Sequence, residues 1–295
     1  MQKIVEIAQS EYISLFLGNL IVKKENKKVT IPTRDIDVLV FENARTTMSI
    51  ALINKLIEEK TNVIICDNKH NPIAQILAIN GYYDNKVFLW QINWNDSFRN
   101  NVWNELIKLK IYNTWFILEE LNLISDCNTQ FKEWIEDVIH GDIKNIEAQV
   151  ARFSFKILFG KKFKRERDTE ECTNLYLNYS YTILNSFIAR HLVSKGLDNR
   201  IGLKHKSFNN FFALACDVME PLRPLMDIFV YKQIIRNENS VNFKQFKEKL
   251  FIYFYETYVL IQGKKTKIID YIDLIITSII QQETIMDLKV SEICE

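Results

Sequence analysis

The sequence predicts an α+β protein in which a small N-terminal β-rich domain, residues 1–80, precedes a larger all-helical C-terminal domain, residues 81–295. Three observations lead to this prediction. The length of 295 residues exceeds that of one typical domain. Short apolar stretches alternate with turn residues at the start of the chain, and long stretches of helical spacing with few glycines or prolines follow.

The first part of the chain has the pattern of β-hairpins and buried strands. Strands are expected at residues 12–16, 20–22, 29–31, 38–41 and 62–66. Gly18-Asn19 and Glu25-Asn26 separate the first three, as turns of hairpins do. Between the last two, residues 49–60 carry Ile53, Leu56 and other apolar residues on one helical face, which predicts an amphipathic helix.

Helices are expected throughout the second part of the chain. The apolar residues Ile107, Ile111, Trp115 and Leu118, for example, recur at helical spacing. The stretches with this character are residues 85–123, 129–140, 143–158, 170–195, 208–235, 243–262 and 267–282.

Composition excludes several classes of protein. Apolar residues make up 47% and charged residues 25%, as in an ordinary globular protein. No apolar run approaches the roughly 18 residues that span a bilayer, and Glu6 and Glu11 interrupt the N-terminus, so we expect a cytoplasmic protein without a membrane partner. The five cysteines form neither a CxxC pair nor an even disulfide set. The seven glycines form no nucleotide-binding loop.

Charge limits how the protein could bind nucleic acid. A formal net charge of +1 is typical of proteins that do not coat nucleic acid, since affinity for phosphate depends on lysine and arginine. DNA binding would therefore depend on local patches, and the candidate patch is the run Lys161, Lys162, Lys164, Arg165 and Arg167. Read alone, such a run is more often a solvated loop.

His205, Asp217 and Glu220 form the most distinctive local pattern. His205 precedes a predicted helix for which Ser207 is a suitable N-cap. Asp217 and Glu220 are three residues apart on that helix, so their carboxylates would share a face. Pro221 follows at once, which predicts a kink or a helix end beside the two acids. A plain alternative is that these acids pair with Arg223 and nearby lysines in solvent.

Glu147 precedes Ala148 and Ala151, which would permit close helix packing, although a lone glutamate is usually a surface residue.

A ligand shell of one histidine and several carboxylates suits Mg²⁺ or Mn²⁺. Such an ion fits phosphodiester chemistry, because it polarises the phosphate and activates an attacking hydroxyl.

A second cluster, Cys66-Asp67 with His70, could suggest a zinc or nucleophilic site. The other ligands of a closed zinc shell are not nearby in the sequence, so turn formation before Pro72 explains the cluster better. His140 and His191 have no recognisable catalytic companions and are interpreted as structural.

Several segments of the sequence form distinctive motifs: LVFEN at 39–43, VIICDNKHNP at 63–72, EAQVARF at 147–153, LNYSY at 177–181, GLKH at 202–205 and CDVMEPLRP at 216–224. Together these motifs resemble the CRISPR-associated spacer-acquisition integrase family, the larger subunit of the adaptation complex, and specifically its type II branch. The resemblance spans nearly the whole chain. The sequence departs from the family pattern at Ser154, where an aromatic residue is usual, and at Ser180, where glycine is common.

The resemblance implies a metal-dependent site with defined ligands. By motif, the family's glutamate, histidine and further acid correspond to Glu147, His205 and Glu220, which would be both the catalytic residues and the ligands of Mg²⁺ or Mn²⁺. Asp217 is the alternate or supporting residue for the third position.

The resemblance also implies an activity and partners. The implied activity is that of a DNA endonuclease and integrase, in which the 3′-hydroxyl of a captured fragment attacks the CRISPR repeat by transesterification. The implied partners are double-stranded DNA, a second copy bound through the N-terminal domain, the smaller adaptation subunit in a heterohexamer, and type II effector and accessory adaptation proteins. Two alternatives stay open: a structure-selective nuclease of branched DNA, and a non-catalytic scaffold that holds DNA.

Overall fold

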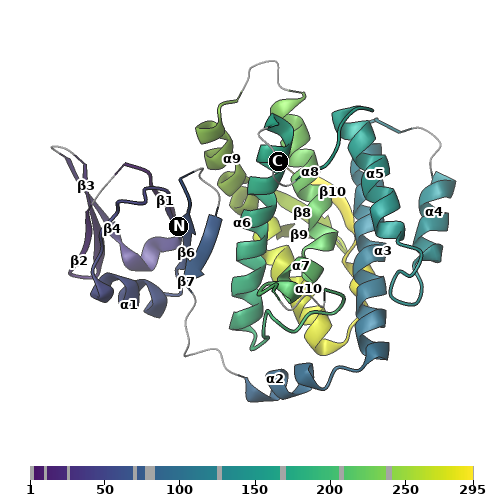
Figure 1. Ribbon diagram of the computed structural model, residues 1–295, viewed down its shortest axis with the longest axis horizontal. Coiled ribbons are helices and arrows are strands. Elements are labelled where there is room, and N and C mark those ends of the chain that lie inside the picture. The colour runs from purple at the N-terminus through teal and green to yellow at the C-terminus, as the bar shows by residue number, and fades with distance from the viewer. Residues whose placement is uncertain are drawn as a thin grey trace. The chain divides into compact units, whose positions relative to one another are not determined.

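The computed structural model describes residues 3–9, 12–24, 27–68, 72–76, 84–124, 128–166, 171–205, 209–236 and 241–294. The chain divides into two compact units, residues 1–82 and 83–295. Figure 1 shows strands grouped in the first unit and helices dominating the second, so the fold is α+β. Among the described residues, no helix has both the length and the apolar character needed to cross a membrane.

The described residues of the N-terminal unit form two small sheets, one α-helix and one 3-10 helix. Its elements are β1 (Lys3–Ile7), β2 (Ile13–Phe16), β3 (Asn19–Lys24), β4 (Lys27–Pro32), η1 (Thr33–Asp35), β5 (Ile36–Phe41), α1 (Ile50–Glu58), β6 (Asn62–Cys66) and β7 (Pro72–Ile76). One sheet has the order β1-β5-β6-β7, with β7 antiparallel to β6 and the other pairs parallel. The other is the antiparallel meander β2-β3-β4.

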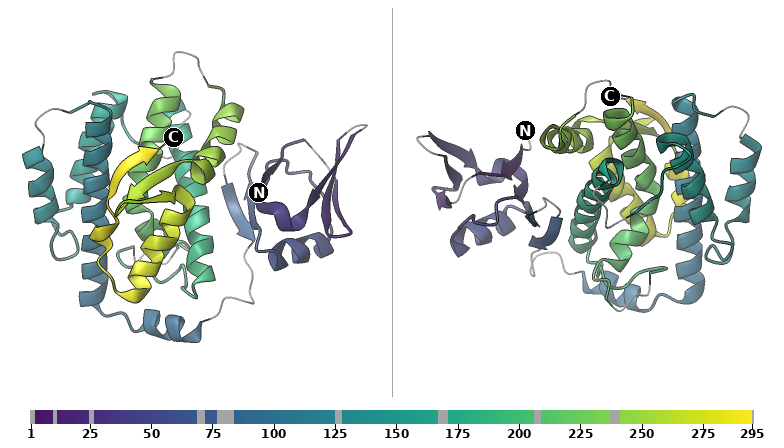
Figure 2. Two further views of the ribbon diagram at one scale, coloured as in Figure 1. Left: turned by 180° about the vertical axis from the view of Figure 1, so that it is seen from behind. Right: turned by 45° about the horizontal axis from the view of Figure 1, so that its top comes forward.

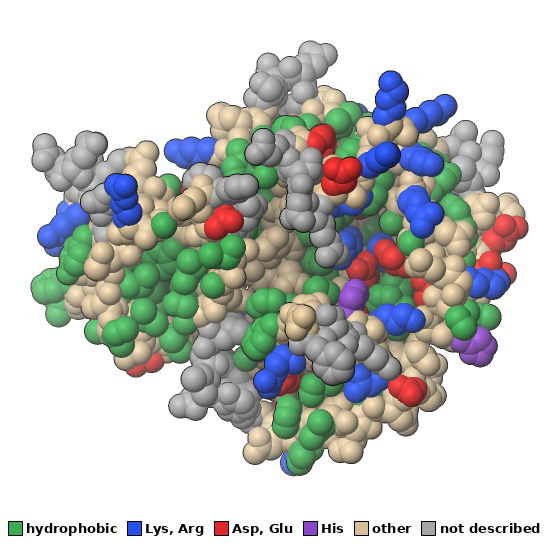
Figure 3. Space-filling view, viewed as in Figure 1, with side chains coloured by type: hydrophobic (Ala, Val, Ile, Leu, Met, Phe, Trp, Pro, Cys, Tyr) green, Lys and Arg blue, Asp and Glu red, His purple; other side chains and the backbone are tan. Residues whose placement is uncertain are grey.

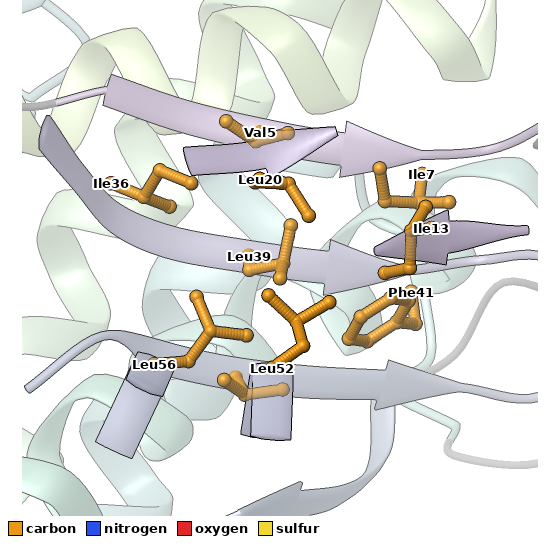
Figure 4. Packing of buried hydrophobic residues seen from close by; sticks show 10 residues of the cluster. Val5, Ile7, Ile13, Leu20, Ile36, Leu39, Phe41, Leu52 and Leu56 are labelled. Carbon is orange, nitrogen blue, oxygen red and sulfur yellow. The ribbon is translucent and has the colours of Figure 1, made fainter. Parts of the chain in front are cut away.

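Apolar side chains from both sheets and from α1 form the core of this unit. Leu52 and Leu56 project from α1 into a cluster with Leu20, Leu39 and Phe41 (Figure 4). The spacing of four residues puts the two leucines on one helical face. The helix predicted at residues 49–60 is therefore present, and Ser49 caps it by accepting a hydrogen bond from the Leu52 N–H.

The C-terminal unit is built mainly of helices. They are α2 (Asn85–Ile92), α3 (Asp96–Glu120), α4 (Asn128–Asp137), α5 (Ile146–Phe159), α6 (Cys172–Ser194), α7 (Ala213–Val218), η2 (Glu220–Leu222), α8 (Arg223–Ile234), α9 (Phe243–Glu256), α10 (Ile268–Gln281) and η3 (Ile285–Leu288). Helix α3 packs against η2, α5 and α8, so it forms the centre of this unit.

Two helix predictions need correction. The stretch 85–123 is broken between α2 and α3, because the Asn95 side chain accepts a hydrogen bond from the Phe98 N–H and starts a new helix. The helix expected from residue 208 begins only at Ala213, and Ser207, its predicted cap, lies outside the described residues. The interruption predicted at Pro221 is present, since α7 ends at Val218 and a 3-10 turn follows.

The prediction of an all-helical second domain is wrong. Strands β8 (Tyr258–Ile261), β9 (Lys264–Lys267) and β10 (Val290–Cys294) form an antiparallel sheet in the order β10-β8-β9. Figure 2 shows this sheet on the side of the unit that faces away from the viewer of Figure 1. Residues 243–262 therefore hold a helix followed by a strand, and Gln262 and Gly263 turn the hairpin with φ values of 50° and 75°.

Candidate active site

Charged side chains from four helical elements and one loop meet in the C-terminal unit. They are Lys110 from α3, Glu147 from α5, Asp217 from α7, Glu220 from η2 and His205 from the loop between α6 and α7. Figure 3 shows acidic and basic side chains gathered near a histidine on one face of this unit. Residues separated by more than 100 positions in the sequence thus contribute to one site.

Glu147 is placed by the turn that precedes its helix. The carboxylate of Asp142 accepts hydrogen bonds from the backbone N–H groups of Ile146, at 2.8 Å, and Glu147, at 3.1 Å. Asn145, directly before α5, has a left-handed conformation and makes no side-chain cap. Asp142, three residues before Asn145, therefore caps the N-terminus of α5 in its place.

Lys110 joins Glu147 to Glu220. Its Nζ atom lies 2.6 Å from the Glu220 Oε2 atom and also donates a hydrogen bond to the Glu147 Oε1 atom. Lys110 and Glu220 are 5% and 4% exposed, so this is a buried ion pair, whereas the Glu147 side chain is 26% exposed. On its other side, the Glu220 Oε1 atom lies 3.1 Å from the Nε atom of Arg223.

This arrangement controls the charge of the buried groups. Burial tends to raise the pKa of Glu220, but the charges of Arg223 and Lys110 outweigh it and the pKa is lowered. For Lys110, burial opposes the charged form, yet the carboxylates of Glu220 and Glu147 raise its pKa. Glu220 and Lys110 are therefore both charged at neutral pH.

Asp217 holds His205. The Asp217 side chain is fully buried, and its Oδ1 atom lies 2.5 Å from the Nδ1 atom of His205. Asp217 also accepts hydrogen bonds from the backbone N–H groups of Leu203, Lys204 and His205. With Nδ1 held by Asp217, the other ring nitrogen, Nε2, is the one available as a ligand.

The environment of His205 connects it to the acids. The hydrogen bond that the His205 ring donates to Asp217 raises the pKa of His205, and the charge of Glu220 adds to this effect. The His205 side chain is 43% exposed and meets the ring of Trp103 edge-on, with centroids 6.2 Å apart. A partly exposed imidazole that interacts electrostatically with the buried carboxylate of Glu220 can bind an ion that enters from solvent.

In the structure, Glu147 and Glu220 both pair with the ammonium group of Lys110. The charge of Glu220 also acts on His205. Asp217 faces His205 and the loop backbone. In the part of the chain that is described, no three His, Cys, Asp or Glu side chains already stand at the spacing of metal ligands. The donor set of two carboxylates and an imidazole nevertheless fits Mg²⁺ or Mn²⁺, whose ligands are oxygen and, for Mn²⁺, nitrogen as well.

The residues of the basic run at 161–167 differ in their exposure. Lys161, Lys162 and Lys164 are exposed. Arg165 is half-buried and donates hydrogen bonds to the side chains of Asn174, at 3.0 Å, and Asn178, at 2.7 Å. Arg167 lies outside the described residues.

Two features of the site were not predicted from the sequence. Lys110 was assigned no role, although a lysine between the apolar residues Leu109 and Ile111 of a central helix was a possible signal.

The second unpredicted feature is a buried pair of side chains, Tyr181 and Asp227, next to Arg223. The guanidinium of Arg223 lies over the ring of Tyr181, 4.8 Å from its centroid, and the Tyr181 hydroxyl donates to Asp227. Burial raises the pKa of Asp227 to about 6.

The alternative cluster in the N-terminal unit cannot be assembled from the described residues. Cys66 is buried in β6 and Asp67 follows it, whereas His70 and Asn71 lie outside the described residues. Burial of the Cys66 side chain agrees with a core role for that residue.

Comparison with known proteins gives one consistent result. The family model for CRISPR associated protein Cas1 matches residues 5–269. A CRISPR-associated endonuclease Cas1 from Neisseria meningitidis is 33% identical over 220 residues, which cover 74% of this chain and 71% of the relative.

Solved structures share the fold. A casposase bound to its integration product superposes with a TM-score of 0.79 at 16% identity, covering 100% of this chain and 96% of the casposase. A chain in a Cas6-RT-Cas1–Cas2 complex gives a TM-score of 0.73 at 18% identity, covering 98% of this chain and 36% of the other.

Proposed function

Because this chain belongs to the CRISPR-associated Cas1 family, we propose that it is a divalent-metal-dependent DNA integrase and endonuclease of CRISPR adaptation. It joins the 3′-hydroxyl end of a captured DNA fragment to the CRISPR repeat by transesterification. The observation that carries the proposal is the convergence of Glu147 and Glu220 on one cation, beside a histidine fixed by a buried aspartate.

In this proposal Glu147, Glu220 and His205, through its Nε2 atom, hold Mg²⁺ or Mn²⁺. The bound ion supplies Lewis-acid chemistry, which stabilises charge on the phosphate and on the attacking and leaving oxygens. Glu147 is partly exposed, at 26%, and so lies where DNA can reach the site.

Asp217 is a positioning residue in this account. Both of its oxygens accept hydrogen bonds from the loop that carries His205, and the residue is fully buried. A carboxylate that holds the second nitrogen of a ligating histidine fixes the ring orientation and raises its basicity. We therefore favour Glu220 over Asp217 as the third ligand.

Arg223 keeps Glu220 ionised. Its Nε atom lies 3.1 Å from Glu220, and its charge is the main influence that lowers the pKa of this buried carboxyl. Glu220 can therefore act as an anionic ligand even though it is buried.

Partners and assembly follow from the family. We propose double-stranded DNA and a Cas2-type adaptation subunit as partners, in line with the Cas1–Cas2 complex that shares the fold. The N-terminal unit is proposed to form the contact between two copies. Phe16 at the end of β2 and Leu17 in the turn that follows are adjacent apolar residues, 59% and 83% exposed, and they support this role because exposed apolar surface marks interfaces. The type II branch remains part of the proposal.

The integration reaction can be tested directly. A fragment with free 3′-hydroxyl ends, a supercoiled plasmid carrying a CRISPR repeat, the smaller adaptation protein and Mn²⁺ are incubated with wild type, His205→Ala or the matched control His191→Ala. We expect joined product with wild type and the control, and a loss of at least about 100-fold for His205→Ala, as for other removed catalytic groups. Joining by His205→Ala at the wild-type rate would refute the proposal.

A structure-selective nuclease of branched DNA is the second candidate, and the name endonuclease of the 33% identical relative favours it. The same residues would serve, with water in place of the 3′-hydroxyl. The ratio of hydrolysed to joined product on one branched substrate ranks the two activities.

A further inference from the structure

Lys110 is a buried lysine at the centre of the charged site. It lies in the middle of α3, between the buried residues Leu109 and Ile111, and is 5% exposed. A buried ammonium group is tolerated only where anionic or polar partners compensate for the lost hydration. Its partners therefore explain why it is there.

Both partners of Lys110 are the acids proposed as metal ligands. The Nζ atom lies 2.6 Å from Glu220 Oε2 and donates to Glu147 Oε1, so one ammonium group bridges acids from two different helical elements. The remaining oxygen of Glu220 faces Arg223 at 3.1 Å. Each oxygen of Glu220 thus already has a cationic neighbour.

The ammonium stands where an ion bridging the two acids would stand. An Mg²⁺ ion binds carboxylate oxygens at about 2.0–2.1 Å, which leaves no space for the Nζ atom between the same two oxygens. The divalent ion and the Lys110 ammonium group would also repel each other strongly if both stood at the same two oxygens.

We propose that Lys110 is a built-in counter-cation that holds Glu147 and Glu220 together and is displaced when a divalent ion binds them. This inference rests on the proposed function of the two acids as metal ligands. It makes Lys110 a positioning residue with two opposed effects: it stabilises the paired acids in the absence of a divalent ion, and it competes with that ion.

The direction in which metal affinity changes when Lys110 is removed distinguishes this competing role from one in which Lys110 only supports the ligands. A lysine that only held the ligands in place would strengthen metal binding, so its removal would weaken the affinity. A competing lysine weakens metal binding, so its removal would increase the affinity. Metal affinity, rather than activity, is therefore the informative readout.

The test is a titration of the full chain with Mn²⁺ alone, in which electron paramagnetic resonance measures the free ion. Lys110→Met is compared with wild type and with Lys108→Met, a matched control on the same helix. We expect the dissociation constant of Lys110→Met to be at least about tenfold lower than that of wild type, because a like charge next to the ion is removed. The control should match wild type. An unchanged or higher dissociation constant for Lys110→Met would overturn the inference.

The same titration tells this inference apart from the proposed function. If neither wild type nor Lys108→Met binds Mn²⁺, or if Glu147→Gln binds it as wild type does, the metal site itself is wrong. If wild type binds and Glu147→Gln does not, the site stands and only the comparison with Lys110→Met decides.

If Lys110→Met does not fold, Lys110→Gln, which keeps a polar group of similar length, is titrated in its place. A second approach needs no variant at all. In wild type, acetic anhydride labelling followed by mass spectrometry reports the reactivity of the Lys110 amine. Saturating Mn²⁺ should increase this labelling several-fold, and labelling that is unchanged or reduced would contradict displacement.

Discussion

The Nδ1 atom of His205 lies 2.5 Å from the Oδ1 atom of Asp217, a fully buried carboxylate. Three backbone N–H groups donate to the same carboxylate. Together these contacts hold residues 203–205 in place, although they belong to no helix or strand. Asp217 was considered as a metal ligand from its place in the sequence, and its contacts favour a different role, orientation of His205.

The first prediction concerns this orientation. In Asp217→Asn, the side-chain NH₂ group must face N–H donors on one side, so we expect lower stability by about 1–3 kcal/mol and a fall in the pKa of His205, which Asp217 raises. Mn²⁺ affinity should fall about 10–100-fold, the usual effect of losing such a partner. Nuclear magnetic resonance titration of the His205 ring measures the pKa. An unchanged His205 pKa would argue against this contact.

The second prediction concerns the cap of α5. Asp142→Ala removes the acceptor for the Ile146 and Glu147 N–H groups and should destabilise the protein by about 1 kcal/mol. Asp142→Asn keeps one acceptor oxygen and a residue that tolerates the left-handed conformation of this position, φ 57°, so it should lose less. Urea unfolding measures the difference. Equal losses in the two variants would contradict a capping role.

The helices were predictable because apolar spacing determines which face is buried. The hairpin β8-β9 was missed because Tyr258–Ile261 continues the apolar run of α9, and Lys264–Lys267 has no apolar pattern of its own. The Gln262-Gly263 turn was the available signal. Lys110 was missed for another reason: periodicity shows that a helix is buried, but it cannot show that acids from α5 and η2 meet one of its lysines.

The candidate ligands were chosen from the family motifs and not from local chemistry. Glu147 read alone is a surface residue, and only the motif around it suggested a role. The structure places it beside Lys110, 37 residues away in the sequence. Contacts of this kind depend on helix packing, which local patterns do not encode.

The third prediction is a pH dependence of stability. Asp227 has a pKa of about 6 in the folded protein, above the ordinary value of an unfolded aspartate, because it is buried. The folded state therefore binds more protons between about pH 4 and 6, and the contribution of Asp227 to stability is lost as pH rises through this window. Relative to Asp227→Asn, wild type should lose up to about 3 kcal/mol from pH 4 to pH 7. Urea unfolding at several pH values measures this. A difference between the two proteins that does not change with pH would contradict it.

The fourth prediction concerns DNA binding by the basic run. Replacing the exposed Lys161, Lys162 and Lys164 by glutamine should weaken binding of duplex DNA and flatten its salt dependence. Each lost phosphate contact reduces the slope of log K against log salt by roughly 0.9. Fluorescence anisotropy at several salt concentrations measures the slope. A variant with the wild-type slope would show that these lysines do not contact phosphate.

The claim that Glu147, His205 and Glu220 bind a divalent ion is tested most directly by the Mn²⁺-dependent rise in melting temperature. An ion that binds only the folded state must stabilise it in proportion to the logarithm of its concentration over Kd. We expect wild type and the control Glu136→Gln, an exposed acid on α4, to show this rise, and Glu147→Gln to show none. A rise of the same size in Glu147→Gln would contradict the account.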